Sequence, residues 1–249
     1  MADATVRLCL WSGPRNISTA TMRSFEARGG CAVWDEPYYG WFLARTGADH
    51  PGRAETLAAW PTDADAIAAA CAGPAPGGEP EFFQKHMCQH MLPELDLSWT
   101  AACRHLFLIR DPAEVAASYY ATRETASPDD LGAERQLTLY DEIAAITGRD
   151  WPVVEGRDVL ADPAAMLERV CGALDIPWRE SMLSWPAGRR ATDGPWAPYW
   201  YRRVEASTGF AAPQPSPHAL PAELEPVVAA CRPAYLEMRE RKLTPAEAD

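Results

Sequence analysis

Short apolar runs alternate with segments of helical periodicity along most of the chain. Five runs of four to seven mostly apolar residues are typical of buried strands: 6–12, 32–35, 81–85, 104–110 and 152–155. Apolar residues recur at helical spacing in 18–28, 37–45, 53–60, 63–71, 112–123, 133–147 and 163–174. Strands that are apolar on both sides are usual in parallel sheets covered by helices. The alternation therefore predicts an α/β fold, a three-layer αβα sandwich with a mostly parallel sheet.

The pattern changes near residue 185. Residues 185–221 are rich in Pro, Trp, Tyr and Arg and have weak periodicity, which predicts an irregular flap over one end of the sheet. Residues 221–242 carry an apolar stripe at helical spacing and are expected to form a C-terminal helix. Pro226 and Pro233 predict a kink or an interruption in that helix. No repeat or linker divides the chain, so we expect a single domain over 1–249.

Charge and composition limit the partners of the protein. The net charge is −12, which argues against nucleic acid and anionic membranes as partners, because both bind basic surfaces. No apolar run approaches the ~20 residues of a membrane span, and no signal peptide is visible. The seven cysteines form no C-x-x-C pair, which favours free thiols in a reducing cytoplasm. An anionic small molecule could still bind where a few basic side chains converge.

The stretch LCLWSGPRNISTATMRSF, residues 8–25, has the layout of an anion-binding loop. A strand pattern meets a tight turn and then a helix start, whose N–H groups and dipole suit a terminal phosphate or sulfate. Ser18 and Thr19 add hydroxyl donors, and Arg15 adds a permanent charge. The nucleotide-hydrolase signature G-x-x-x-x-G-K-[ST] is absent. An ordinary turn with a surface arginine is the alternative interpretation.

A second basic site is expected where residues 104–110 end. Arg110 closes this apolar run, and Ser118 follows it by eight residues in a predicted helix. The carboxyl end of a parallel strand is where open α/β folds bind their ligands. Pairing of Arg110 with Asp111 is the structural alternative.

Together the two segments resemble the sulfotransferases that use 3′-phosphoadenosine-5′-phosphosulfate (PAPS). That family has a loop of the type P-[KR]-S-G-[ST]-T for the 5′-phosphosulfate, and an Arg followed eight residues later by Ser for the 3′-phosphate. The resemblance spans residues 6 to about 210 and implies a P-loop-type sheet. It implies that Arg110 and Ser118 bind the 3′-phosphate. It assigns the phosphosulfate to the loop residues Gly13, Pro14, Arg15, Asn16, Ile17, Ser18 and Thr19, with Asn16-Ile17 standing where Ser-Gly is usual.

Two acidic residues follow the second predicted strand. Asp35 and Glu36 after an apolar run resemble the magnesium-binding segment of ATP-using enzymes, which would indicate a kinase. Some sulfotransferases carry a catalytic Glu at this point, and Glu36 resembles that residue. By this resemblance Glu36 is the base that accepts the proton of the acceptor. A solvated acidic turn, with Asp35 as a structural partner, is the alternative.

Lys85 is one of only two lysines in the chain and ends the third predicted strand. Sulfotransferases commonly have a lysine here that contacts the transferred group. In members with K-T-H the histidine is the base, but Met87 stands at that position. His86 and His90 are alternatives to Glu36 as base. They are four residues apart, which without a third ligand is a weak zinc signal, and we expect no metal.

The sequence thus predicts a cytoplasmic PAPS-dependent sulfotransferase. Arg15, Glu36 and Lys85 are the predicted catalytic groups, and a hydroxyl or amine of a small molecule is the predicted acceptor. The product would be 3′-phosphoadenosine-5′-phosphate. A P-loop small-molecule kinase and a sulfotransferase-like binding protein without chemistry remain alternatives. The acceptor, the oligomeric state and the flap arginine nearest the nucleotide stay open; the candidates for the last are Arg189, Arg190, Arg202 and Arg203.

Overall fold

The computed structural model describes residues 5–123, 125–213 and 219–244, and within these ranges five strands form one sheet. The strands lie in the order β2-β3-β1-β4-β5, and every neighbouring pair is parallel. Their bounds are β1 Val6–Ser12, β2 Cys31–Asp35, β3 Glu81–Met87, β4 Arg104–Ile109 and β5 Val153–Glu155. All five predicted strands are confirmed, and the α/β class with them.

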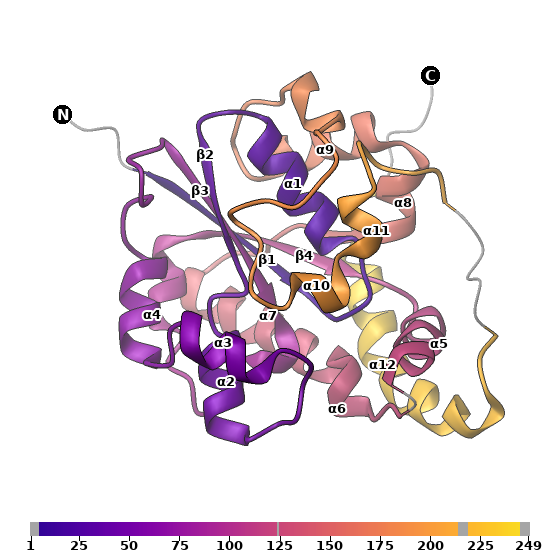
Figure 1. Cartoon of the computed structure of the whole chain (residues 1–249). Helices are drawn as coiled ribbons and strands as arrows, with labels where there is room; N and C mark the ends of the chain where they lie inside the picture. The colour runs from indigo at the N-terminus through magenta and orange to yellow at the C-terminus, as the bar shows by residue number, and fades with distance from the viewer. Residues whose placement is uncertain (1–4, 124, 214–218, 245–249) are drawn as a thin grey trace.

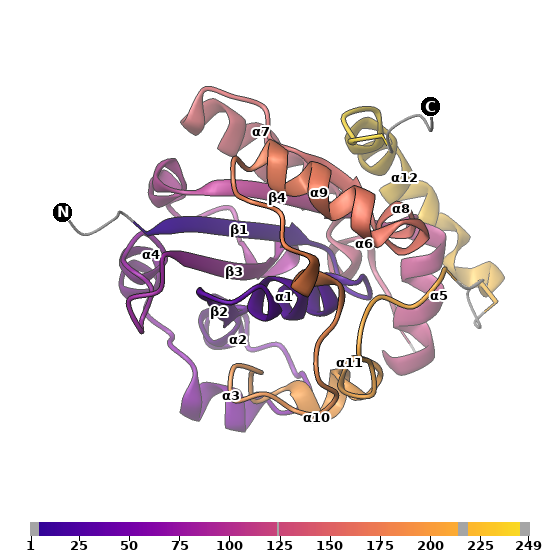
Figure 2. The same cartoon turned by 90° about the horizontal axis from the view of Figure 1, so that it is seen from above.

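Helices cover both faces of the sheet and complete the three layers (Figures 1 and 2). The helices whose side chains share a core with Leu10 are α1 Ser18–Ala27, α8 Gly156–Ala161 and α9 Pro163–Ala173. Those that share a core with Trp11 are α4 Ala64–Cys71, α7 Ala133–Thr147 and α12 Glu225–Glu240. Leu10 and Trp11 are neighbours in β1 and belong to different cores because successive strand residues point to opposite faces.

Six further helices are described. They are α2 Tyr39–Thr46, α3 Arg53–Ala59, α5 Pro112–Arg123, α6 Pro128–Leu131, α10 Ala197–Trp200 and α11 Arg202–Glu205. Four 3₁₀ turns are also described: η1 Cys88–His90, η2 Ser98–Ala102, η3 Glu180–Leu183 and η4 Ala222–Leu224. Of the helices in the body of the chain, the sequence pattern missed α6 and α8, which are too short to show a period.

The strand order reverses beside β1. The chain runs from β1 to the edge strand β2, returns to β3, and then crosses β1 to reach β4. In open α/β sheets the crevice at such a reversal is where ligands bind. Ser12 of β1, Asp35 of β2, Lys85 of β3 and Ile109 of β4 lie at or near this edge. The fold therefore collects the predicted site residues on one edge of the sheet.

Two predictions about the last quarter of the chain need correction. The flap expected over 185–221 is not wholly irregular, because it contains α10 and α11, while 214–218 lie outside the described residues. Of the kink or interruption predicted for the C-terminal helix, the interruption is wrong: α12 is one helix, Glu225–Glu240, with Pro226 in its first turn and Pro233 inside it. A first-turn proline removes an N–H that has no helical partner, which explains the tolerance of Pro226.

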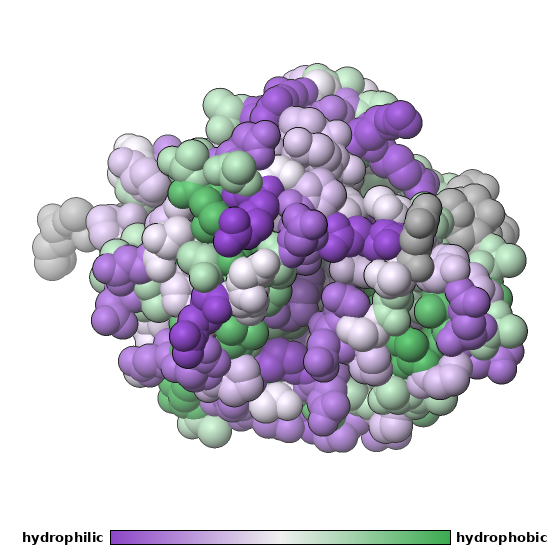
Figure 3. Space-filling model, turned by 60° about the horizontal axis from the view of Figure 1, so that its bottom comes forward, coloured by the Kyte–Doolittle hydropathy of each residue, from purple (hydrophilic) through white to green (hydrophobic). Residues whose placement is uncertain are grey.

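Hydrophilic residues cover most of the face that Figure 3 shows, and hydrophobic residues gather only in small patches. Within the described ranges, we find no helix with the length and apolar character needed to cross a membrane.

Candidate functional site

The loop between β1 and α1 presents backbone N–H groups at the carboxyl edge of the sheet. Ile17 is the N-cap residue of α1 and supplies no side-chain hydrogen bond to the first turn. The N–H groups of such a turn have no partner inside the helix, and the helix dipole adds partial positive charge. The predicted loop residues thus surround a helix end that suits an anion. Behind the loop, Gly13 and Pro14 line a cavity of about 30 Å³, which has room for at least one water molecule.

The side chain of Asn16 fixes the path of this loop. Its Nδ2 donates to the carbonyl of Leu108 on β4 (3.2 Å), and its Oδ1 accepts from the N–H of Ile17 (2.8 Å). A Cβ at Gly156 would lie 2.6 Å from Oδ1 of Asn16, so a larger residue there would force the amide out of this position. The Asn16-Ile17 pair, unusual for the sulfotransferase pattern, therefore anchors the loop to β4.

Three arginines gather beside the loop. Arg15 Nε donates to Oγ of Ser118 on α5 (3.0 Å), and Arg110 donates to the carbonyl of Arg15. Burial lowers the pKa of Arg15, as do the nearby charges of Arg110 and of Arg203 from α11. Arg110 also pairs with Glu114 (2.9 Å), one turn into α5. The guanidinium groups of three separate elements thus repel one another, and an anion bound among them would relieve that repulsion.

Lys85 lies at the centre of a buried polar cluster. Its Nζ is 2.7 Å from Oδ1 of Asp35 and 2.8 Å from Oε1 of Glu36, and its side chain is 1% exposed. It also donates to the hydroxyl of Tyr201 (2.6 Å) and, at 3.2 Å, to Oγ1 of Thr19 on α1. Thr19 thereby joins this cluster to the anion-binding loop. Burial lowers the pKa of Lys85, but Asp35 and Glu36 together raise it by more than burial lowers it, so the ammonium stays charged.

Glu36 combines a shifted pKa with an unusual backbone. The pKa of Glu36 is raised to about 7, because burial and the nearby charge of Asp35 raise it by more than Lys85 lowers it. Two carboxylates share one lysine, so the buried cluster carries one net negative charge that a proton on Glu36 would cancel. Among the described residues, three that are not glycine have positive φ, and Glu36 (43°) and Arg15 (55°) are two of them. Such strained residues tend to concentrate at functional sites.

The two histidines lie in different surroundings. His90 Nδ1 is 3.6 Å from Oε2 of Glu36, and the ring stacks on Tyr39 with centroids 4.4 Å apart. Burial, His50 and Lys85 lower the pKa of His90 well below its ordinary value. His86 points to the opposite face of β3 from Lys85, where it stacks on Trp11, and burial lowers its pKa to about 3. The structure thus brings His90, and not His86, next to Glu36.

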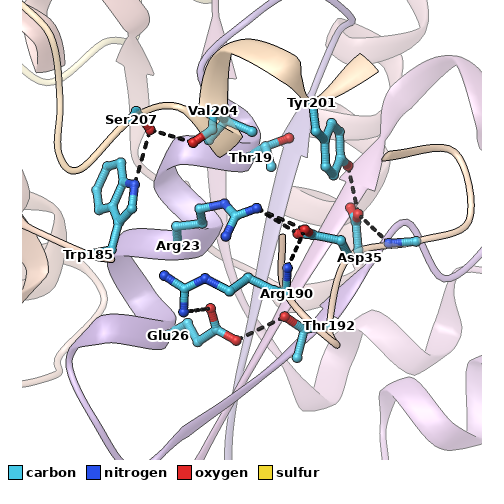
Figure 4. A network of polar contacts seen from close by, with 12 residues as sticks. Thr19, Arg23, Glu26, Asp35, Trp185, Arg190, Thr192, Tyr201, Val204 and Ser207 are labelled. Atoms are coloured by element: carbon cyan, nitrogen blue, oxygen red, sulfur yellow. Dashed lines mark hydrogen bonds and ion pairs between the residues drawn. The ribbon is translucent and has the colours of Figure 1, made fainter. Parts of the chain in front are cut away.

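The flap is joined to the site by buried contacts. Arg23 of α1 forms a two-bonded ion pair with Asp193 of the flap (2.9 and 3.0 Å), with both side chains at most 1% exposed. The hydroxyl of Tyr201 and the N–H of Gly194 both donate to Oδ2 of Asp35, at 2.6 and 3.2 Å. Figure 4 shows α1, β2 and the flap meeting in this network. Residues of the flap therefore cover the buried cluster around Lys85.

Sequence reasoning missed the roles of Tyr201 and Arg23. Tyr201 was one of several aromatic residues in a segment without periodicity, and no motif marked its hydroxyl. Arg23 lies on the buried face of α1 and is 1% exposed, a rare position for a charge without a partner. That burial is visible only once the flap and its Asp193 are in place.

Metal-ligating side chains do not cluster in the described part of the chain. No group of three or more His, Cys, Asp or Glu residues there could hold a metal ion. Asp35 and Glu36, the acidic pair of the kinase alternative, face the ammonium of Lys85 instead.

Comparison with known proteins identifies a family for this chain. The family profile described as a sulfotransferase domain matches residues 6–242. Two curated relatives from Arabidopsis thaliana are the branched-chain-amino-acid aminotransferase-like proteins 2 and 1. They are 33% identical over 229 residues and 32% identical over 211 residues, which cover 92% and 85% of this chain. The chain spans only about two fifths of their length, 40% and 38%.

A solved structure shows the same fold. The sulfotransferase from Alicyclobacillus acidocaldarius superposes with a TM-score of 0.55, covering 96% of this chain and 98% of that one. Its sequence is 13% identical to this one, so the likeness concerns the arrangement of the elements.

Proposed function

Because the chain belongs to the sulfotransferase domain family, we propose that it transfers a sulfuryl group from PAPS to a hydroxyl or amine of a small-molecule acceptor. The bond between sulfur and its bridging oxygen breaks as the acceptor oxygen or nitrogen bonds to sulfur. The acceptor loses a proton, and 3′-phosphoadenosine-5′-phosphate leaves. The observation that carries the proposal is the buried Asp35–Glu36–Lys85 cluster, joined through Thr19 to an uncapped helix start.

The residues present fit a nucleotide with two separate anionic groups. The N–H groups at the start of α1 suit the phosphosulfate. Arg110 and Ser118 suit the 3′-phosphate, and Arg15, which contacts both, would bind between the two groups. Arg203 is the flap arginine we assign to this anion, because its charge already acts on Arg15. Arginine forks match phosphate oxygens in two-bonded contacts.

Glu36 is the proposed base. A base works best when its pKa lies near the working pH, and the pKa of Glu36 is about 7. His90 is a weaker base, because its pKa lies well below the ordinary value of histidine. Glu36 therefore removes the acceptor's proton, and His90 packs against it.

Lys85 is the proposed electrostatic catalyst. An ammonium has three N–H donors, and here Asp35, Glu36 and Tyr201 all lie within 2.8 Å of Nζ. When Glu36 takes a proton it loses its charge and holds Lys85 less strongly. One N–H of Lys85 then becomes available to the oxygens on which negative charge grows, and stabilisation of such charge often contributes more to catalysis than any other effect.

The same cluster argues against the kinase alternative. A magnesium site needs carboxylate oxygens that face the ion and its water shell. The oxygens of Asp35 and Glu36 instead face an ammonium at 2.7 and 2.8 Å. A metal ion in that position would have to displace a buried lysine.

The names of the curated relatives suggest aminotransferase chemistry, which this chain does not support. Pyridoxal phosphate enzymes bind their cofactor through a lysine that reacts as a neutral amine. The chain has two lysines, Lys85 and Lys242. Burial lowers the pKa of each lysine, but the carboxylates around each raise it by more than burial lowers it, so both remain protonated.

Sulfuryl transfer is tested directly with PAPS labelled in its sulfur. The purified protein is incubated with labelled PAPS and a panel of hydroxyl and amine acceptors, and labelled product is separated and counted. We expect transfer to at least one acceptor class, and loss of transfer in Glu36→Gln with nucleotide binding retained. Transfer from ATP with magnesium, and none from PAPS, would contradict the proposal.

A further inference from the structure

We propose that Tyr201 is a positioning residue. Its hydroxyl sets how strongly the ammonium of Lys85 interacts with Asp35 and with Glu36, and so keeps Glu36 available as the base. The inference rests on the proposed function of Glu36 and Lys85. It makes the flap a working part of the catalytic centre, although Tyr201 lies 116 residues after Lys85 in the chain.

The hydroxyl of Tyr201 has every hydrogen-bonding position filled. It donates to Oδ2 of Asp35 (2.6 Å) and accepts from Nζ of Lys85 (2.6 Å) and from the indole N–H of Trp196 (3.0 Å). A tyrosine oxygen has one proton and two lone pairs, so this arrangement fixes where its proton points. The residue is 5% exposed, and water has little access to replace any of these bonds.

This geometry treats the two carboxylates differently. Asp35 receives bonds from Tyr201, from the N–H of Gly194 and from Lys85, which together stabilise its negative charge. For Glu36 the short polar contact is Lys85 at 2.8 Å, with His90 farther away at 3.6 Å. Of the two acids, Asp35 is therefore the one held by several hydrogen-bond donors, and Glu36 is the one left free to take up a proton.

Loss of the hydroxyl of Tyr201 should draw the ammonium of Lys85 closer to Asp35. Without the proton of Tyr201, Asp35 depends more on Lys85, and Glu36 is left with less positive charge nearby. The pKa of Glu36 should then rise, because the positive charge of Lys85 is what opposes the effect of burial on this carboxyl group. The titratable groups that face Glu36 are Asp35 of β2, Lys85 of β3, Tyr39 of α2, His90 of η1 and Tyr201 of the flap.

The test compares Tyr201→Phe with the wild-type protein and with Tyr199→Phe. Tyr199 lies on α10 in the same flap and is 49% exposed, so its variant controls for the loss of a phenol hydroxyl. The side-chain carboxyl resonance of Glu36 in ¹³C-glutamate-labelled protein is followed against pH and assigned by its absence in Glu36→Gln. We expect its midpoint to rise in Tyr201→Phe by roughly one pH unit, the effect of one bond to a charged group, and to stay unchanged in Tyr199→Phe.

An unchanged or lower midpoint in folded Tyr201→Phe would overturn the proposal. If that variant does not fold, 3-fluorotyrosine at position 201 keeps the ring and makes the hydroxyl a stronger donor, so the midpoint of Glu36 should fall. Failure of this opposite shift would equally refute the role of Tyr201.

Activity separates this inference from the function on which it rests. In the pH profile of kcat/KM with PAPS, the acid limb of Tyr201→Phe should move to higher pH with the resonance of Glu36. A wild-type protein without sulfuryl transfer would refute the proposed function, while the titration would still decide whether Tyr201 controls Glu36. If the titration midpoint of Glu36 shifts in Tyr201→Phe but the acid limb of the kcat/KM profile does not, Glu36 is not the base.

Discussion

The buried ion pair between Arg23 and Asp193 should determine whether the flap stays closed over the site. Asp193→Asn keeps the shape of the side chain but removes its charge. Among the described residues, Nε and Nη1 of Arg23 have no hydrogen-bond partner, so Asp193 carries most of the compensation for this buried charge. Removing one partner of such a pair costs about 3–5 kcal/mol. That is a large part of the ~5–15 kcal/mol that stabilises a typical folded protein.

The assay is urea unfolding followed by circular dichroism, together with limited proteolysis of the flap. For Asp193→Asn we expect a lower free energy of unfolding and faster cleavage within residues 185–213. The thermal midpoint should fall by roughly 6–20 °C, from about 2–4 °C per kcal/mol at this chain length. Arg23→Met combined with Asp193→Leu should recover much of the loss, because a packed apolar pair replaces two buried charges.

An exposed ion pair of the same length provides the control. Arg45 and Glu94 are 3.0 Å apart, but their side chains are 62% and 46% exposed, so Glu94→Gln should leave unfolding and cleavage as in the wild type. The reasoning is refuted if Asp193→Asn behaves like Glu94→Gln, because the flap would then be held by contacts other than this pair.

The further predictions concern three residues of the site. Glu36→Gln should reduce turnover by ~10²–10⁴ with nucleotide binding intact, and wild-type activity should rise with pH through about 7, where Glu36 ionises. Since folding raises the pKa of Glu36 from 4.5, Glu36 should make the wild-type free energy of unfolding fall between about pH 4.5 and 7, and urea titrations of Glu36→Gln should lack that part of the slope. Arg110→Ala should weaken binding of 3′-phosphoadenosine-5′-phosphate by roughly 10–150-fold in calorimetry, with near-normal turnover at saturating PAPS; unchanged affinity would remove Arg110 from the site. Asn16→Ala should cost about 1–3 kcal/mol in urea unfolding and weaken nucleotide binding, since the loop loses its anchor on β4; if both stay unchanged, the loop holds its path without Asn16.

The strands and the edge of the sheet that holds the site were predictable because they depend on local patterns. Each strand is a continuous apolar run, and parallel strands bring their carboxyl ends to one edge. Asp35, Lys85 and Arg110 could thus be expected on the same side of the sheet before their contacts were known.

The partners of these residues were not predictable in the same way. Lys85 meets Tyr201 across 116 residues, and Arg23 meets Asp193 across 170. Both contacts come from a flap whose sequence has no period, so no local signal indicates which of its residues turns inward. Arg15 is a related case: the sequence marks its charge, but only the positions of Ser118 and Arg110 show which end of the loop it faces.

The most direct test of the central claim is calorimetric titration of the protein with 3′-phosphoadenosine-5′-phosphate and, separately, with ADP. Both carry two phosphates, but the first has one of them on the 3′-oxygen, where the arginines are proposed to bind, whereas ADP has both in its 5′ chain. We predict binding of the first to be at least tenfold tighter, the contribution of one or more bonds to a charged phosphate, and to need no magnesium. Equal affinity for ADP, or binding that depends on magnesium, would contradict a PAPS site at this loop.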